Sequence, residues 1–257
     1  MKETRVIMGM PIIVHIVNDD KVLASAIIDK VFRYFLSIDE RFSLYKKDSE
    51  ISLINQGKID KENYSRDMRE IMRLAEETRL QTDGYFDIRD PDGFINTSGI
   101  VKGWAIFNAS QIIRECGIKN YFINAGGDIE LGGVNEDKQL WRVGIEDSLH
   151  LGETTRILSL TDCGIATSGT YIRGDHIYNP KTQKKNEKID DGIRLKSITI
   201  IGPNVYEADR FATPAFVMGE NAIAFIEKQK GLEGYIIDTE GREMMTKGFS
   251  KYFVENK

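Results

Sequence analysis

Asp209 and Thr213 are the residues whose types and spacing most directly suggest chemistry. They lie four positions apart, so on a helix both side chains lie on the same face. A carboxylate and a hydroxyl, together with substrate phosphates, are oxygen donors of the kind that Mg²⁺ takes. The simpler interpretation is that Asp209 is a helix N-cap and Thr213 an exposed helix residue. Pro214 complicates a helix here, because proline disfavours helical backbone at the residue before it.

The stretch 84–133 combines glycines with a lysine in a way that suggests an anion site. Lys102 follows Ser98-Gly99 near the start of an expected helix, where backbone N–H groups favour negative charge. Gly126-Gly127 follows a short apolar strand and would let the backbone approach a ligand closely. These features predict a phosphate-bearing ligand at a loop–helix junction. A plain Gly-Gly-Asp turn and a solvated lysine are the alternative interpretation.

Two later groups of polar residues are further candidates. His176 stands in a loop-rich context with Asn179-Pro180, which suits acid–base work, although a turn histidine bonded to backbone is equally expected. Thr167 and Ser168 place hydroxyls next to Gly169, where they can line a phosphate or ring pocket or form a turn. The sequence contains no Walker loop, no G-x-G-x-x-G and no nucleophile elbow, which argues against an ordinary P-loop or Rossmann protein.

Composition limits the class of protein. The 257 residues suit one large domain or two small lobes, and 41% apolar and 29% charged residues are ordinary for a globular chain. A net charge of −5 gives no general basic surface for nucleic acid. We see no signal peptide, lipid anchor or transmembrane run, so we expect a cytoplasmic protein, provided that no leader was removed. In a reducing compartment Cys116 and Cys163 are expected to be buried thiols.

Apolar periodicity predicts the elements that must position these residues. In the first half we expect a strand over 6–17 that bends at Gly9 and Pro11, a short helix from Ser49 to Asn55, helices over 21–36, 65–82 and 101–116, and a strand over 120–124. In the second half we expect helices over 209–218 and 220–229, and strands over 141–146, 156–160, 164–168, 196–202, 234–238 and, at an edge, 248–253. Local pattern makes Tyr45 a packing residue and Asn55 a helix C-cap.

Taken together, short motifs occur in a specific order along the chain. They are Met8-Gly9-Met10-Pro11, Tyr45, Ser49-Glu50-Ile51-Ser52-Leu53-Ile54-Asn55, Gly84-Tyr85-Phe86-Asp87, Ser98-Gly99-Ile100-Val101-Lys102-Gly103, Asn124-Ala125-Gly126-Gly127-Asp128, Ala166-Thr167-Ser168-Gly169, His176 with Asn179-Pro180, and Ala208-Asp209-x-x-x-Thr213. In this order they resemble the ApbE family, the FAD:protein FMN transferases. The resemblance runs from Met8 to Gly219. Each motif is weak alone, and the ordered set is specific.

The resemblance implies both a fold and a reaction. The fold would be α+β, a two-lobed architecture related to the T-fold, with mixed or antiparallel sheets flanked by helices and a flavin cleft between the lobes. Residues 1–257 would form one such domain. The reaction would be Mg²⁺-dependent: FAD is cut at its diphosphate, FMN is joined through a phosphoester to a Thr or Ser of an acceptor protein with an Asp-x-x-Thr/Ser motif, and AMP leaves.

The resemblance also assigns residues to roles. For FAD it implies contacts from Met8, Tyr45, Tyr85, Phe86, Asp87, Asn96, Lys102, Thr167 and Ser168. For Mg²⁺ it implies the side chains of Asp209 and Thr213 and the backbone oxygen of Gly99. For catalysis it implies His176 as a base, Asn55 near the metal and diphosphate, and Asp209.

Some positions depart from the family pattern. Asn96 stands where an Asp is common, Pro214 is unusual after the metal threonine, and the segment 88–101 is short. These departures keep two alternatives open: a FAD pyrophosphatase that releases FMN and AMP, and a non-catalytic FAD-binding protein.

Overall fold

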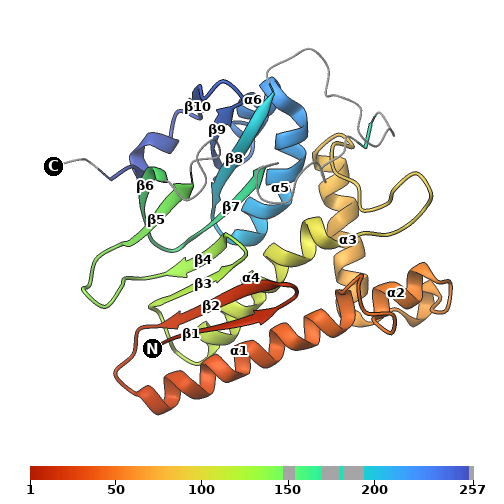
Figure 1. Cartoon of the computed structure of the whole chain (residues 1–257), viewed down its shortest axis with the longest axis horizontal. Helices are drawn as coiled ribbons and strands as arrows, with labels where there is room; N and C mark the ends of the chain where they lie inside the picture. The colour runs from red at the N-terminus through yellow and green to blue at the C-terminus, as the bar shows by residue number, and fades with distance from the viewer. Residues whose placement is uncertain (147–153, 170–179, 182–193, 255–257) are drawn as a thin grey trace.

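A computed structural model describes residues 1–146, 154–169, 180–181 and 194–254 (Figure 1). The predicted base His176 and its neighbour Asn179 lie outside these residues.

Eight strands form one antiparallel sheet in the order β1-β2-β3-β4-β7-β8-β9-β10. Their bounds are β1 Lys2–Ile7, β2 Met10–Ile16, β3 Tyr121–Ala125, β4 Asp128–Gly132, β7 Cys163–Gly169, β8 Leu195–Gly202, β9 Glu233–Asp238 and β10 Glu243–Met245. The strands β5 (Trp141–Glu146) and β6 (Thr154–Leu160) form a separate antiparallel pair.

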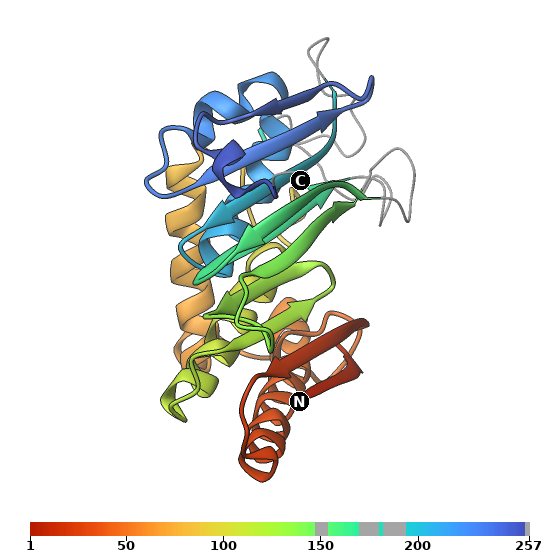
Figure 2. The same ribbon diagram turned by 90° about the vertical axis from the view of Figure 1, so that its left-hand side faces the viewer.

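Helices cover one face of this sheet, with α3 and α5 on the same side (Figures 1 and 2). The α-helices are α1 Lys21–Phe42, α2 Glu50–Asn55, α3 Arg66–Gln81, α4 Ser98–Glu115, α5 Val205–Met218 and α6 Ala222–Ile226, and the 3-10 turns are η1 Lys61–Asn63, η2 Gly219–Asn221 and η3 Phe249–Tyr252. Alternation along β8 sends Ile198 and Ile200 into the core below α5 and α6, whereas Ile201 joins the core shared with β5 and β6. The second half of the sheet is therefore buried on both faces.

Several helix ends agree with the capping residues in the sequence. Ser49, Ser65 and Asp20 cap α2, α3 and α1, each accepting a backbone N–H with its side chain. The helix α1 runs on to Phe42, beyond the expected end at 36, because Ile38 and Phe42 continue its buried stripe.

Three sequence expectations differ from the structure. The expected strand 6–17 is the hairpin β1–β2, because Met8 and Gly9 both adopt positive φ (57° and 71°) and form its turn. The expected edge strand 248–253 is mainly η3. The expected helix from 209 begins at Val205 instead, with Asn204 as its N-cap, so Asp209 is not a capping residue.

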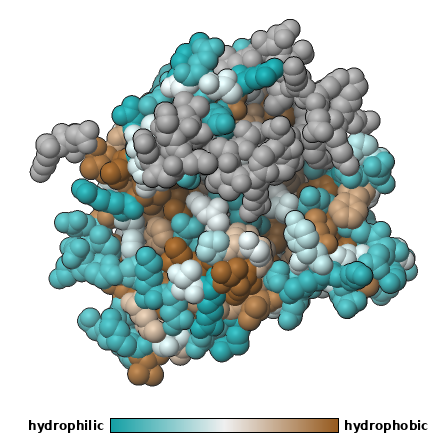
Figure 3. Space-filling view, viewed as in Figure 1, coloured by the Kyte–Doolittle hydropathy of each residue, from teal (hydrophilic) through white to brown (hydrophobic). Residues whose placement is uncertain are grey.

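The surface of the described residues gives no strong functional signal of its own. Val6 (76% exposed) and Val22 (82% exposed) are separate apolar side chains of a kind that ordinary surfaces carry. On the face drawn in Figure 3 hydrophilic and hydrophobic side chains are mixed. Within the described ranges, no helix has the length and apolar character needed to cross a bilayer.

Candidate functional site

The helices α4 and α5 meet at Gly103 and Asp209. The backbone N–H of Gly103 donates to Oδ2 of Asp209 at 2.8 Å, and Asp209 is buried. A Cβ on Gly103 would stand 2.6 Å from the Asp209 Cβ and 3.0 Å from the Val205 carbonyl oxygen. Only glycine therefore allows the two helices to approach this closely.

The same contact brings the three predicted metal ligands together. In an α-helix the carbonyl of one residue faces the N–H four residues later, so an oxygen bonded to the Gly103 N–H lies close to the Gly99 carbonyl. Thr213 follows Asp209 by one turn on α5, and its Oγ1 lies 3.2 Å from the Ser168 Oγ on β7. The predicted hydroxyl-bearing strand end and the predicted metal pair thus share one site.

Lys102 lies between two buried carboxylates and is not a solvated surface residue. Its Nζ is 2.6 Å from Oδ2 of Asp128 and 3.8 Å from Oδ1 of Asp209. Asp128 is 1% exposed, and its Oδ1 accepts the N–H of Thr167 at 3.2 Å. In the sequence Asp128 stands out only as the last residue of the Asn124–Asp128 motif, and no role was predicted for it. Its one local signal was an acidic residue directly after two glycines.

The charge balance of this cluster favours a cation. Burial raises the pKa of Asp209 well above its ordinary value; the Lys102 ammonium acts in the opposite direction, and Asp128 reinforces the rise. The ionised form of Asp209 is therefore disfavoured in the metal-free protein, and a bound cation would stabilise it, because two carboxylates then face a single ammonium. A carboxylate, a hydroxyl and a backbone carbonyl are donors that fit Mg²⁺. The described residues contain no group of three His, Cys, Asp or Glu side chains that could hold a metal, so water or phosphate oxygens would complete the shell.

Phe86 and its neighbours lie beside the start of α4. The edge of the buried Phe86 ring lies 3.1 Å from where a Cβ on Gly99 would stand, and the Phe86 N–H donates to Oγ1 of Thr82 at 3.1 Å. The Lys181 ammonium lies 4.2 Å from the centroid of the Tyr85 ring. Asp87 uses one carboxylate oxygen to accept the N–H of Arg89.

Asn55 holds the loop that leads into α4. Its Nδ2 donates to the Ile95 carbonyl at 2.9 Å and its Oδ1 accepts the Ile95 N–H at 2.8 Å. Asn55 is the last residue of α2, whereas Gln56 is the C-cap, so the expected capping role was wrong. Asn96 is exposed, and its Oδ1 accepts the N–H of Ser98. A hollow beside Asn55 is also lined by Tyr64, Arg89 and Phe94.

The two glycines at 126 and 127 form the β3–β4 hairpin turn, with φ of 60° and 99°. They do not lie at a loop–helix junction, so the turn interpretation was right at this point. The Gly126 N–H donates to the Pro11 carbonyl, which places this turn beside the β1–β2 turn that contains Met8. Tyr45 is 98% exposed, so its ring is not packed in the core of this chain.

Comparison with known proteins shows which family combines these features. The family model described as the ApbE family matches residues 8–90 and 88–236. This chain belongs to the ApbE family.

Two curated relatives of this chain carry the same name. A protein of Vibrio cholerae named FAD:protein FMN transferase is 33% identical over 139 residues, covering 51% of this chain and 40% of the relative. A protein of Salmonella typhimurium with the same name is 27% identical over 179 residues, covering 65% of this chain and 50% of the relative. The chain thus spans about half the length of the curated relatives it matches.

Solved ApbE structures share the fold. The flavin transferase ApbE from Vibrio cholerae superimposes with a TM-score of 0.81 at 22% identity, covering 98% of each chain. The apo flavinyl transferase ApbE from Pseudomonas stutzeri gives a TM-score of 0.83 at 20% identity, covering 99% of this chain and 97% of that one. The predicted α+β class with antiparallel sheets and flanking helices is confirmed. The division into two lobes and the roles of individual residues stay predictions.

Glu130 fixes the start of the helix that carries Asp209. It is fully buried on β4, and its Oε2 accepts the N–H of Val205, the first residue of α5, at 2.6 Å. Its Oε1 lies 3.4 Å from Nη2 of Arg114. Gly164 on β7 makes room, because a Cβ there would stand 1.8 Å from the Val205 nitrogen.

Glu130 makes stability depend on pH. Burial raises the pKa of its carboxyl from 4.5 to about 8. Between these values the folded state keeps a proton that the unfolded state releases, so the stabilisation is complete below about pH 4.5 and is lost as the pH rises toward 8. Wild type should lose up to about 1.4 kcal/mol of unfolding free energy per pH unit in this window relative to Glu130→Gln. Urea unfolding at pH 5 to 8.5 measures this, with exposed Glu115→Gln as control; parallel pH curves for wild type and Glu130→Gln would contradict it.

Proposed function

We propose that this protein is a Mg²⁺-dependent flavin transferase that cleaves FAD and attaches FMN to a threonine or serine of an acceptor protein, with release of AMP. The observation that carries the proposal is the buried cluster of Asp209, Lys102 and Asp128 at the start of α4. Membership of the ApbE family and the names of the relatives support it.

The proposed reaction is a substitution at phosphorus. The acceptor hydroxyl oxygen bonds to the phosphorus of the FMN half, the bond from that phosphorus to the bridging oxygen breaks, and AMP leaves with the electron pair. The hydroxyl proton passes to a base, for which His176 is the predicted residue. Such transfers depend on positioning and charge neutralisation more than on covalent help from the protein.

The residues of the cluster divide this work among them. Asp209, Thr213 and the Gly99 carbonyl would hold Mg²⁺, which when bound neutralises charge on the diphosphate. Asp128 holds the Lys102 ammonium at 2.6 Å and so fixes a positive charge beside the same position. Phe86, against Gly99, would place the flavin side of the substrate next to the metal side.

The proposal includes further contacts with FAD. Two hollows lie beside predicted substrate residues, one lined by Asn55 and Phe94 and the other by Thr82 and Tyr85. We propose that FAD also contacts Met8, Tyr45, Asp87, Asn96, Thr167 and Ser168. The acceptor we propose is a cytoplasmic protein that carries an Asp-x-x-Thr/Ser motif.

The test is transfer to a small carrier domain that displays Asp-x-x-Thr. Incubation with FAD and Mg²⁺ should give a fluorescent flavin band that survives denaturation, and a carrier with that Thr replaced by Val should give none. Removing metal with EDTA should lower the rate by at least about a hundredfold, because metal stabilisation of phosphoryl charge is worth several kcal/mol.

The products separate the proposal from its alternatives. Chromatography that finds free FMN and AMP, with no labelled carrier, would identify a pyrophosphatase instead. Bound FAD that is not turned over, with or without Mg²⁺, would identify a flavin-binding protein and reject the transferase.

A further inference from the structure

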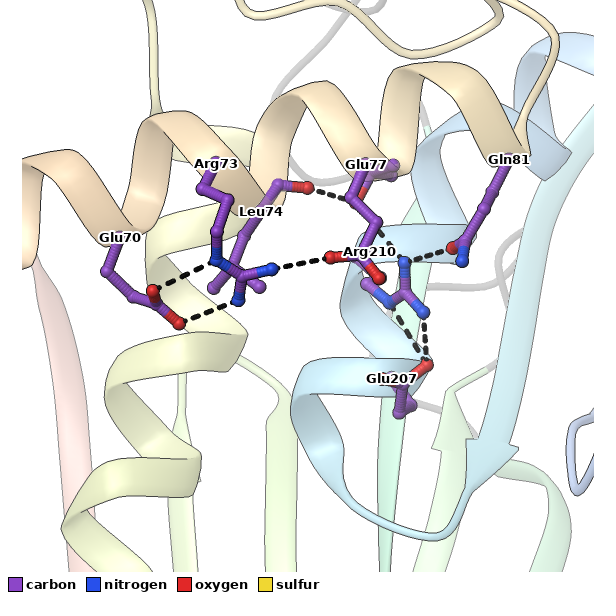
Figure 4. Close-up of polar contacts among 8 residues, drawn as sticks. Glu70, Arg73, Leu74, Glu77, Gln81, Glu207 and Arg210 are labelled. Carbon is purple, nitrogen blue, oxygen red and sulfur yellow. Dashed lines mark hydrogen bonds and ion pairs between the residues drawn. The ribbon is translucent and has the colours of Figure 1, made fainter.

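Arg210, the residue after Asp209, connects α5 to α3 through a buried guanidinium. Its Nε and Nη2 donate to Oε2 of Glu207 at 3.0 and 2.7 Å on its own helix. Its Nη1 donates to Oε1 of Gln81 at 2.5 Å and to Oγ1 of Thr78 at 3.4 Å on α3. Figure 4 shows the Arg210 side chain between Glu207 and Gln81, at the end of α3. Arg210 itself is 7% exposed.

This position requires arginine specifically. The planar guanidinium directs three nitrogens toward two helices, which the single ammonium of a lysine cannot do. The guanidinium carbon also lies 4.2 Å from the centroid of the Phe211 ring and 5.3 Å from that of Tyr206. Arg210 is therefore held rigidly by both charge and packing.

The contact with Gln81 lies at the start of a path to the proposed flavin side. Gln81 ends α3, and the next residue, Thr82, accepts the Phe86 N–H with its hydroxyl at 3.1 Å. The Phe86 ring in turn lies against Gly99 on α4. The end of α3 thus holds the backbone from which the Phe86 ring extends toward Gly99.

We infer that Arg210 is a positioning residue that sets the Phe86 ring relative to Asp209. Asp209 holds α5 to α4 through the Gly103 N–H, and Arg210, one residue further on, holds α5 to the end of α3. Adjacent residues of one helix thereby tie α5 to both neighbouring helices. The consequence for flavin rests on the proposed function, whereas the positioning itself does not.

Two variants and a matched control separate this role from general stability. Gln81→Ala removes the acceptor on α3 from an exposed position and leaves the Glu207 pair intact. Arg210→Lys keeps the positive charge but loses the planar guanidinium that bonds Glu207 and Gln81 at the same time. Arg73→Gln is the control, because Arg73 makes ion pairs of 2.9 Å to Glu70 and to Glu77 that stay within α3, and its side chain is 59% exposed (Figure 4).

The first measurement is amide hydrogen exchange of residues 83–87 in flavin-free protein, with β8 amides as the reference for global opening. We expect roughly tenfold faster exchange of the Phe86 amide in Gln81→Ala and Arg210→Lys, with β8 changing less, because the bond lost between α5 and α3 involves a charged group. Arg73→Gln should leave this exchange unchanged, because the ion pairs it removes stay within α3. The second is FAD affinity from quenching of flavin fluorescence, which should weaken roughly fivefold in the same two variants.

The two measurements have distinct outcomes. Unchanged Phe86 exchange in Gln81→Ala, or a change equal to that of β8, would overturn the inference. Faster local exchange with unaltered FAD affinity would overturn the part that concerns flavin. If wild type does not bind FAD, the proposed function fails, and the exchange result still decides whether Arg210 positions Phe86.

Discussion

Asp209→Asn should lower flavin transfer by at least about a thousandfold while leaving the folded protein at least as stable as wild type. Asparagine fills the same volume and can still accept the Gly103 N–H, which lies 2.8 Å from the carboxylate. It removes the negative charge that the proposed metal site needs. Because burial already disfavours that charge, its loss costs the folded state little or nothing. The transfer assay and urea unfolding at pH 8 measure the two effects.

Asp137→Asn makes the same chemical change at an exposed position and serves as the control. It should alter neither rate nor stability. Transfer by Asp209→Asn within about tenfold of wild type would show that this carboxylate does not carry the reaction.

Gly103→Ala should lower both stability and transfer. The added methyl would stand 2.6 Å from the Asp209 Cβ and 3.0 Å from the Val205 carbonyl oxygen, so α5 must move away from α4. Overpacking of this kind costs about 1–3 kcal/mol, offset in part by the roughly 1 kcal/mol that alanine gains over glycine in a helix. Because the shift moves Asp209, we expect transfer to fall by about a hundredfold or more.

Gly99→Ala is the comparison for this variant, because it lies one turn earlier on the same helix. Its methyl would meet only the edge of the Phe86 ring, at 3.1 Å, and that ring can give way slightly. The free energy of unfolding, measured in urea, should therefore be clearly lower for Gly103→Ala than for Gly99→Ala. Equal stability of the two variants would show that the α4–α5 contact at Gly103 has room for a methyl group.

Local signals in the sequence predicted most elements of the fold correctly. Helix α3 has a serine cap at Ser65 and a regular apolar stripe, and Asp83-Gly84 follows directly after its C-cap, Thr82. Capping residues and apolar periodicity depend on neighbours within one helix, so they can be recognised without knowing the tertiary contacts. The β1–β2 hairpin was missed because its turn needs positive φ at Met8. Methionine rarely adopts positive φ, so the residue type gave no sign of a turn at this position.

The helix α5 shows where local reasoning fails. Pro214 complicates a helix by local rules, yet it lies inside α5, where it cannot donate the usual bond to the Arg210 carbonyl. Burial of α5 against β7, β8 and α4 compensates for this loss, as do the bonds of Arg210 to Glu207 and Gln81. Propensity was overridden by packing that involves distant segments.

The sequence by itself determined the order of the motifs, the family, the helix caps and the identity of the oxygen donors on α5. Only the tertiary structure decided that Lys102 lies between Asp128 and Asp209. It also decided that the backbone N–H of Gly103 donates a hydrogen bond to the Asp209 carboxylate. Gly103 and Asp209 are 106 positions apart, and no periodicity along the chain encodes a contact at that separation. It arises because a glycine on α4 lets α5 approach until a buried charge meets its partners.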